Sequence, residues 1–252
     1  MKNLLILILL LSACTTQKHI DSNYLNLMKG VMINEYQIQP TDGYNIQDRI
    51  NGIGHNPNAY TMLSLKQLDA IETFVRDIEK NKIEGDLIEC GVWRGGATIF
   101  MKSLLKSFND TTRKVWVSDS FEGCPKPNPE KYPEDAHSDW YLNPNIAVSL
   151  EQVQTNFKKF DLLDNKVVFL KGWFKNTLPG PIKKLSLLRV DGDLYESTMD
   201  AISLSVGGYF IDDDYGSIPQ SKKAIDDYRK QHNITEKIIP IDITGIYWQK
   251  TK

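Results

Sequence analysis

The chain has 252 residues, of which 41% are hydrophobic and 25% charged, and its 30 basic and 32 acidic residues leave a formal net charge of −2. These values are typical of a folded globular protein and exclude a disordered or fibrous chain. Because the charges nearly balance, no overall field draws the chain to nucleic acid, and we expect no nucleic-acid partner. Three cysteines without a CxxC pair provide neither a disulfide framework nor a zinc site.

The first 21 residues differ in composition from the rest. Lys2 is followed by an apolar run over residues 4–11 and by Ser12-Ala13-Cys14, which is the layout of a secretory signal and resembles a bacterial lipobox. Cleavage before Cys14 and lipid attachment would anchor the protein to a membrane, since the apolar run is too short to span one. The alternative is a later translation start, for example at Met28, which gives a cytoplasmic protein.

Residues 22–63 are polar and rich in turn residues. We expect a helix over residues 24–38, followed by a loop. Such a segment is either a lid over a binding site or a surface extension, and its composition favours the extension.

From residue 64 onward, apolar residues alternate between helical and strand spacing. The pattern predicts helices over residues 64–79, 97–108, 149–160 and 194–200, strands over residues 86–90, 114–119, 166–170, 186–191 and 208–212, and an edge strand pair over residues 238–241 and 246–249. Short apolar strands that alternate with helices predict an α/β fold with a doubly wound, mostly parallel sheet.

A glycine-rich turn, residues 89–96, joins the first predicted strand to its helix. Glycine allows a ligand to approach the backbone closely, and the start of the helix offers free N–H groups. Asp119 ends the next strand, where an acid commonly hydrogen-bonds ribose hydroxyls. The two features together predict an adenosine-type ligand, with tight packing of the turn as the alternative.

Acidic residues follow two further strands, as Asp191-Gly192-Asp193 and as Asp212-Asp213-Asp214. Parallel strands end at one edge of a sheet, so these carboxylates should converge there, which is costly without a cation. Oxygen ligands suit Mg²⁺, Mn²⁺ or Ca²⁺. The alternatives are surface acids that cap helices, or the DxD site of a metal-dependent glycosyltransferase at Asp191-Gly192-Asp193.

Three other residues have two interpretations each. His137 lies in a loop that could reach this edge, although a histidine there more often faces solvent. Trp173 could line a pocket or fill the core. Cys90 is expected to pack against the core because no basic neighbour lowers the pKa of its thiol.

Five motifs occur in a fixed order: Glu89 to Ala97, Val117 to Phe121, Phe169 to Phe174, Asp191 to Thr198, and Gly207 to Tyr209 with Asp213 to Tyr215. Together they resemble the macrocin O-methyltransferase (TylF-type) family, which methylates sugar hydroxyls of macrolide antibiotics. The resemblance covers residues 24–252. It implies a class I methyltransferase with a Rossmann-like sheet over residues 64–252 and an N-terminal helical lid segment over residues 22–63. It also implies S-adenosylmethionine and Mg²⁺ as cofactors and a small-molecule glycosyl substrate.

The resemblance assigns roles by position. The cofactor-binding residues are Thr61, Met62, Glu89, Cys90, Gly91, Val92, Trp93, Asp119, Ser120, Phe121 and Trp173. The metal ligands are Asp191, Asp213 and Asp214. The resemblance does not assign the proton acceptor; the candidates are Asp191, from the metal site, and His137, from its loop. Thr61 and Met62 as cofactor contacts favour a lid over a mere extension.

One departure from the family concerns the connection between Asp191 and Gly208, which is close to the minimum for a parallel crossover. We therefore expect the last parallel strand to be displaced. A shift of about 1 Å at Asp213 and Asp214 can cost on the order of 100-fold in rate. A catalytically impaired, envelope-anchored binding protein is then the alternative to an active enzyme. The sequence leaves open whether the protein forms a homo-oligomer.

Overall fold

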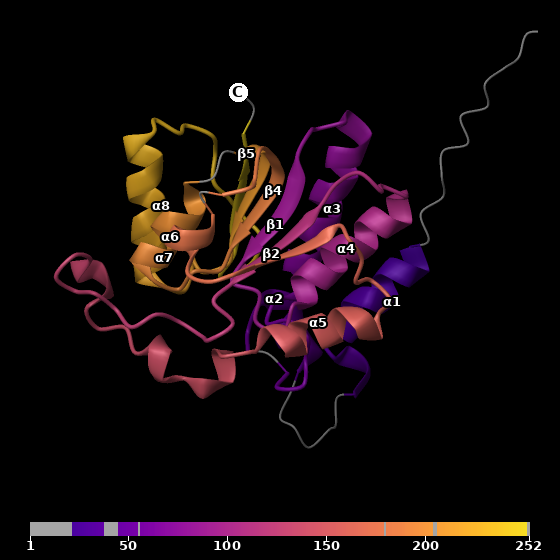
Figure 1. The fold of residues 1–252 in the computed structure, drawn as a ribbon, viewed down its shortest axis with the longest axis horizontal. Helices are drawn as coiled ribbons and strands as arrows, with labels where there is room; N and C mark the ends of the chain where they lie inside the picture. Colours follow the sequence, from indigo (N-terminus) through magenta and orange to yellow (C-terminus); the bar gives the residue numbers. More distant parts are fainter. Residues whose placement is uncertain (1–21, 38–44, 55, 179, 204–205, 251–252) are drawn as a thin grey trace, which may run out of the picture.

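A seven-stranded sheet runs through the middle of the protein, in the order β3-β2-β1-β4-β5-β7-β6 (Figure 1). The computed structural model describes residues 22–37, 45–54, 56–178, 180–203 and 206–250. The strands are β1 (Asp86–Cys90), β2 (Val115–Asp119), β3 (Val167–Lys171), β4 (Leu185–Val190), β5 (Val206–Asp212), β6 (Ile239–Pro240) and β7 (Ile246–Gln249). Neighbours among β1 to β5 are parallel, while β7 runs antiparallel to β5 and β6. The expected doubly wound, mostly parallel sheet with an edge strand pair is confirmed.

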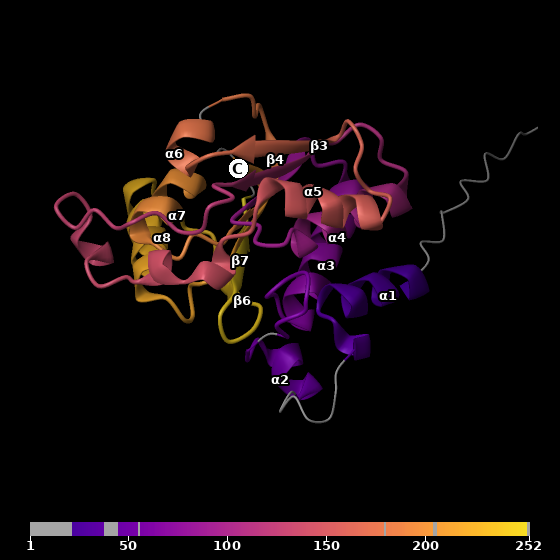
Figure 2. The ribbon, with the colours of Figure 1, turned by 60° about the horizontal axis from the view of Figure 1, so that its bottom comes forward.

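Helices cover both faces of the sheet (Figures 1 and 2). On one face lie α3 (Leu65–Asn81), α4 (Gly96–Phe108) and α5 (Leu150–Lys159), with the N-terminal helices α1 (Ser22–Met32) and α2 (Ile46–Asn51) nearby. On the other lie α6 (Phe174–Thr177), α7 (Tyr195–Ile202) and α8 (Pro219–Gln231). Each face has its own hydrophobic core, so the strands are apolar on both sides, as expected for a buried parallel sheet.

Several helical segments differ from the sequence-based expectation, among them the short helices α2 and α6, where no helix was expected. The helix expected over residues 24–38 ends at Met32, and a short 3₁₀ turn, Glu35–Gln37, follows; residue 38 lies outside the described residues. Sequence analysis gave no helix at α8, whose buried residues are only Ser221, Ala224 and Ile225. The inward face of this helix carries few large apolar side chains, so its periodicity is a weak signal.

The segment before α3 is tied firmly to the carboxyl edge of the sheet. Arg49, which is 1% exposed, donates hydrogen bonds to the carbonyl oxygens of Gly54, Met62 and Leu63. The N–H of Gly96 donates to Tyr60 O at 3.0 Å. The stretch around residues 60–63 is therefore held against the first turn of α4, above the end of β1.

The displacement expected for β5 is not seen where that strand meets the site. Asp212 pairs with Val190 of β4, and the N–H of Asp213 donates to Val190 O at 3.1 Å. The register shift in this pair lies at the other end, between Leu185 and Leu187. An irregularity at the start of the strand leaves its carboxyl end in register.

Candidate active site

A cavity of about 500 Å³ opens at the carboxyl ends of the central strands. One side is lined by the segment before α3 and by the turn after β1, and the other by the ends of β4 and β5 and by α7. Open α/β sheets bind ligands at this place.

Two glycine positions in the turn after β1 have no room for a side chain. Gly91 has φ 86°, and a Cβ on it would lie 2.1 Å from Asp191 O. A Cβ on Gly96 would lie 2.5 Å from Tyr60 O. Only glycine permits both contacts, which bring the backbone of the turn next to the end of β4 and to the segment before α3.

Asp119 holds this turn against the end of β2. Its Oδ2 accepts the N–H of Val92 and its Oδ1 accepts the N–H of Phe121, each at 2.7 Å. Burial raises the pKa of Asp119, although the two backbone donors oppose the shift. The carboxylate lines the cavity, at the position expected for an acid that contacts a ribose.

Most residues expected to bind the cofactor surround this part of the cavity. The lining includes Thr61, Met62, Glu89, Gly91, Val92, Trp93, Asp119, Ser120 and Trp173. Two expectations need correction, because the side chains of Cys90 and Phe121 are buried in the cores and do not line the cavity. Each can offer only its backbone. Burial raises the pKa of the Cys90 thiol, in agreement with a packing role.

Arg189, which sequence analysis did not single out, connects the two sides of the cavity. It is completely buried, with Nη1 2.6 Å from Glu89 Oε1. Its Nη2 lies 3.1 Å from Asp191 Oδ2 and 2.7 Å from Asp213 Oδ2. Burial lowers the pKa of Arg189, but the three carboxylates, Asp213 foremost, outweigh it and raise the pKa. The sequence did contain a signal for this role, since Arg189 is the one charged residue within the otherwise uncharged strand β4.

Glu89 is also completely enclosed. It accepts the N–H of Thr98 in α4 at 2.9 Å through Oε2. Burial raises its pKa to about 8 even though Arg189 opposes the shift. Its two oxygens therefore join β4 to the first turn of α4, and the residue lines the cavity.

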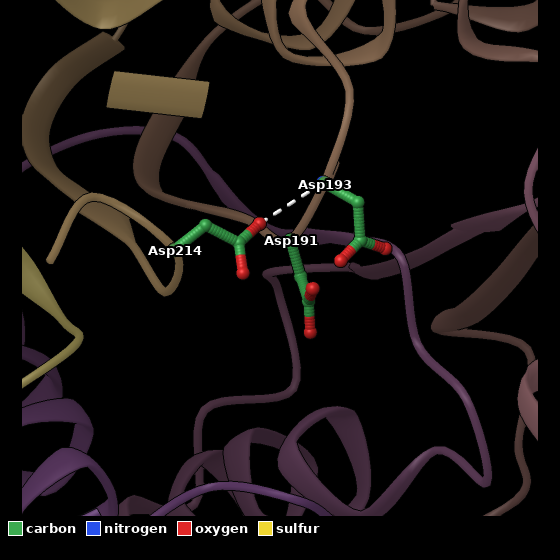
Figure 3. Close-up of side chains that lie close together, drawn as sticks. All are labelled: Asp191, Asp193 and Asp214. Carbon is green, nitrogen blue, oxygen red and sulfur yellow. Dashed lines mark hydrogen bonds between the residues drawn. The ribbon is translucent and has the colours of Figure 1, made fainter. Parts of the chain in front are cut away.

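Three carboxylates converge at the ends of β4 and β5 (Figure 3). Asp191, Asp193 and Asp214 each offer an oxygen within 4.8 Å of the others. The N–H of Asp193 donates to Asp214 Oδ2 at 3.0 Å. Burial raises the pKa of Asp193 to about 7 and that of Asp214 well above its ordinary value, and the neighbouring carboxylates add to both shifts.

The expected ligand set of Asp191, Asp213 and Asp214 shares two members with this converging group. Among the described residues the converging group contains Asp193, while Asp213 pairs with Arg189. Asp213 Oδ1 is buried and has no hydrogen-bond partner within the described part of the chain. An all-oxygen group with crowded negative charge and one unpaired buried oxygen beside it fits a hard divalent cation.

His137 is not in this site, contrary to the expectation that it could accept the proton. It is exposed on the long loop between β2 and α5 and does not line the cavity. The loop is anchored instead by Asp135, whose carboxylate accepts the N–H groups of Tyr195 at 2.7 Å and Glu196 at 3.0 Å. Asp135 therefore caps α7 from outside, next to the converging carboxylates.

Comparison with known proteins agrees with this geometry. Residues 2–250 match the family described as macrocin O-methyltransferase (TylF). Demethyldecarbamoylnovobiocin O-methyltransferase of Streptomyces niveus is 42% identical over 92% of this chain and 95% of its own. The chain therefore belongs to the macrocin O-methyltransferase family. It is an S-adenosylmethionine-dependent O-methyltransferase of class I, as its motifs indicated.

Further relatives support the same conclusion. An O-methyltransferase of Streptomyces olivaceus that acts on a rhamnosyl-tetracenomycin is 43% identical over 90% of this chain and 92% of its own. The solved structure of the O-methyltransferase NovP is 43% identical, covers 92% of this chain and 99% of its own, and superposes with a TM-score of 0.88. The calicheamicin methyltransferase CalS11, with 17% identity, coverage of 92% of this chain and 95% of its own, and a TM-score of 0.60, shares the fold.

Family membership favours methyl transfer over the glycosyltransferase alternative for Asp191-Gly192-Asp193. None of the helices in the described part of the chain has the length and apolar character needed to span a lipid bilayer. Cys14 and the rest of the leader lie outside the described residues.

Proposed function

We propose that this O-methyltransferase methylates a hydroxyl of a sugar or another polyhydroxylated small molecule, with Mg²⁺ at the converging carboxylates. The observation that carries the proposal is the shared cavity, which has Asp119 and the glycine turn on one side and Asp191, Asp193 and Asp214 on the other. A nucleoside-type cofactor and a cation-bound hydroxyl would then meet in one space.

The relatives support the sugar acceptor. The named substrate of the Streptomyces olivaceus enzyme carries a rhamnosyl group, and a Micromonospora griseorubida relative, 40% identical over 81% of this chain and 83% of its own, is a mycinamicin III 3″-O-methyltransferase. At such identities we infer the same class of acceptor for this chain.

S-adenosylmethionine is proposed to lie along the cofactor-lining residues, with its ribose hydroxyls on Asp119. Thr61 and Met62 would cover it from the lid, and Trp173 would flank it from the loop after β3. Because both reactants are held in one cavity, methyl transfer gains the advantage of proximity. The acceptor oxygen forms a bond to the methyl carbon while the bond from that carbon to sulfur breaks, which leaves S-adenosylhomocysteine.

Mg²⁺ is proposed to be held by Asp191, Asp193 and Asp214, with Asp213 Oδ1 as a further oxygen. Its positive charge would lower the pKa of a nearby hydroxyl.

We assign proton acceptance to Asp193, in place of the expected Asp191. Arg189 already engages Asp191 Oδ2 at 3.1 Å, whereas Asp193 lines the cavity and forms no ion pair within the described residues. Without a bound cation, burial raises the pKa of Asp193 to about 7. A cation on this carboxylate would lower that pKa, so the assignment rests on the position of Asp193 in the cavity.

The test combines binding and turnover. Calorimetry with S-adenosylhomocysteine, with and without Mg²⁺, measures the two sites separately. Mass spectrometry after incubation with S-adenosylmethionine and a panel of glycosides should reveal a product heavier by one methylene group, and chelation should abolish it. Methylation that persists unchanged in excess chelator would exclude the role of Mg²⁺, and methylation only of acceptors that are neither sugars nor polyhydroxylated would exclude the acceptor class.

We also propose a cytoplasmic location, because S-adenosylmethionine is a cytosolic metabolite. The alternative is a lipoprotein anchored at Cys14. Mass spectrometry of the N-terminus of protein from its native host separates the two, since a lipid-modified Cys14 would contradict the cytoplasmic proposal.

A further inference from the structure

The turn between β6 and β7, residues 241–245, lies where the lid segment meets the loop that follows β5 (Figure 2). We propose that Asp242 is a positioning residue, which fixes the cofactor-lining end of the lid and the loop that carries Asp214 relative to one another. Asp242 does not line the cavity, so it acts through its neighbours. The Asp214 half of this inference rests on the proposed Mg²⁺ site.

On the lid side, Asp242 holds the start of α3. Its Oδ2 accepts a hydrogen bond from the hydroxyl of Ser64, the N-cap of that helix. Ser64 directly follows the cavity-lining residues 61–63. Gln67, also in the first turn of α3, donates to Thr244 Oγ1 at 3.2 Å. A Cβ on Gly52, which ends α2, would lie 2.9 Å from Asp242 Oδ2.

The opposite side of the turn supports the loop after β5. The N–H of Gly216 donates to Thr244 O at 2.7 Å, and a Cβ on Gly216 would lie 2.1 Å from Ile243 O. The N–H groups of Ser217 and Ile218 both donate to Asp214 O at 2.8 Å. The loop is thus closed on Asp214 at one end and rests against the turn at Gly216.

The Asp242 carboxylate shapes the turn that makes these contacts. Its Oδ1 accepts the N–H groups of Thr244 at 3.0 Å and Gly245 at 2.8 Å. One carboxylate therefore sets the position of Thr244 O for the loop and also binds Ser64 for the lid. A change in the Asp242 side chain itself should loosen both partners, because they are joined through it, whereas removal of one partner's contact should loosen mainly that partner.

The principal variant is Asp242→Asn, which keeps the size of the side chain but leaves one oxygen to accept hydrogen bonds. Calorimetry should show weaker binding of both S-adenosylhomocysteine and Mg²⁺, by about 10-fold each. This is the lower end of the loss in metal affinity when residues that position metal ligands are changed. The matched control is Asp226→Asn on α8, where Asp226 is exposed and pairs with Lys222; its two affinities should equal those of the unaltered protein.

Two further variants each change one of the two contacts and so separate the effect on the lid from the effect on the loop after β5. Ser64→Ala removes the contact to Asp242 together with the N-cap bond from Gln67 N, both on the lid side, and should weaken S-adenosylhomocysteine binding more than Mg²⁺ binding. Gly216→Ala forces the loop away from Ile243 O and should weaken Mg²⁺ binding more. They also keep the inference testable if Asp242→Asn does not fold.

A purely structural role for Asp242 would lower the Tm while both dissociation constants stay within twofold of the unaltered protein, and this result would overturn the inference. If the unaltered protein binds S-adenosylhomocysteine but not Mg²⁺, the proposed metal site is refuted. The effect of Asp242→Asn on S-adenosylhomocysteine binding would then still decide the role of Asp242.

Discussion

Arg189 and Glu89 form a completely buried ion pair, with Nη1 of one 2.6 Å from Oε1 of the other. The pair joins the end of β4 to the end of β1, and Nη2 of Arg189 faces Asp191 and Asp213. A single cation thereby balances carboxylates on both the cofactor side and the metal side of the cavity. Removing one partner of such a pair leaves a buried charge without compensation.

Arg189→Met should therefore lower the free energy of unfolding by about 3–5 kcal/mol, the usual cost of breaking a buried pair. Denaturant unfolding measures the loss. The control is the double variant Arg189→Met with Glu89→Gln, which removes charge from both partners and should recover part of the stability. An Arg189→Met protein as stable as the unaltered one would show that the pair does not hold the site together.

The crowded carboxyls should make the metal-free protein less stable as the pH rises. Burial raises the pKa of Asp193 and Asp212 to about 7 and that of Asp213 to about 6. In the unfolded chain, the pKa of aspartate is about 3.9. Between these values the folded state binds more protons than the unfolded state, so its stability falls as pH increases from about 4 to about 7.

Thermal unfolding in chelator should thus give a lower Tm at about pH 8 than at about pH 5.5. Mg²⁺ should raise the Tm more at the higher pH, because its ligands are then deprotonated. Asp213→Asn, which removes one of the titrating groups, is the control and should flatten the dependence. A Tm that rises with pH in chelator would contradict the prediction.

Asp119→Ala should chiefly weaken cofactor binding. The variant loses the proposed contact to the ribose and the acceptor for the N–H groups of Val92 and Phe121. Hydrogen bonds to a charged group contribute about 1.5–3 kcal/mol, so the dissociation constant for S-adenosylhomocysteine should rise by about 10- to 100-fold. Calorimetry provides the measurement, and an unchanged constant would mean that the ribose assignment is wrong.

Asp193→Asn and His137→Ala should differ sharply in turnover. An amide at position 193 cannot accept a proton, so kcat should fall by about 100-fold or more, while S-adenosylhomocysteine still binds. His137 is exposed and outside the cavity lining, so His137→Ala should keep the kcat of the unaltered enzyme. If the two results were reversed, His137 and not Asp193 would be the proton acceptor.

Local sequence features predicted the elements of the sheet closely. The strand at β1 was expected over residues 86–90 and is observed there, because Leu87 and Ile88 form an apolar pair that is buried in the sheet. The helix expected over residues 64–79 is α3, with Ser64 as its cap. By contrast, α8 buries too little apolar surface to be detected.

The glycine turn and Asp119 were predictable for the same local reason. A strand, a turn and a helix in succession place Gly91 at the carboxyl edge, and its positive φ follows from the tight turn itself. That Asp119 lies at this edge as well follows from the parallel order of neighbouring strands.

The sequence by itself thus determined the order of the strands and of the apolar helices between them, the edge of the sheet where ligands bind, and the acids that could reach it. Only the tertiary structure decided which acids converge: Asp193 joins Asp191 and Asp214, and Asp213 turns to Arg189. It alone revealed that Asp242 binds Ser64 from the far end of the chain. The physical reason is that periodicity reports burial along one element, whereas these contacts depend on how elements far apart in the chain are placed around one another.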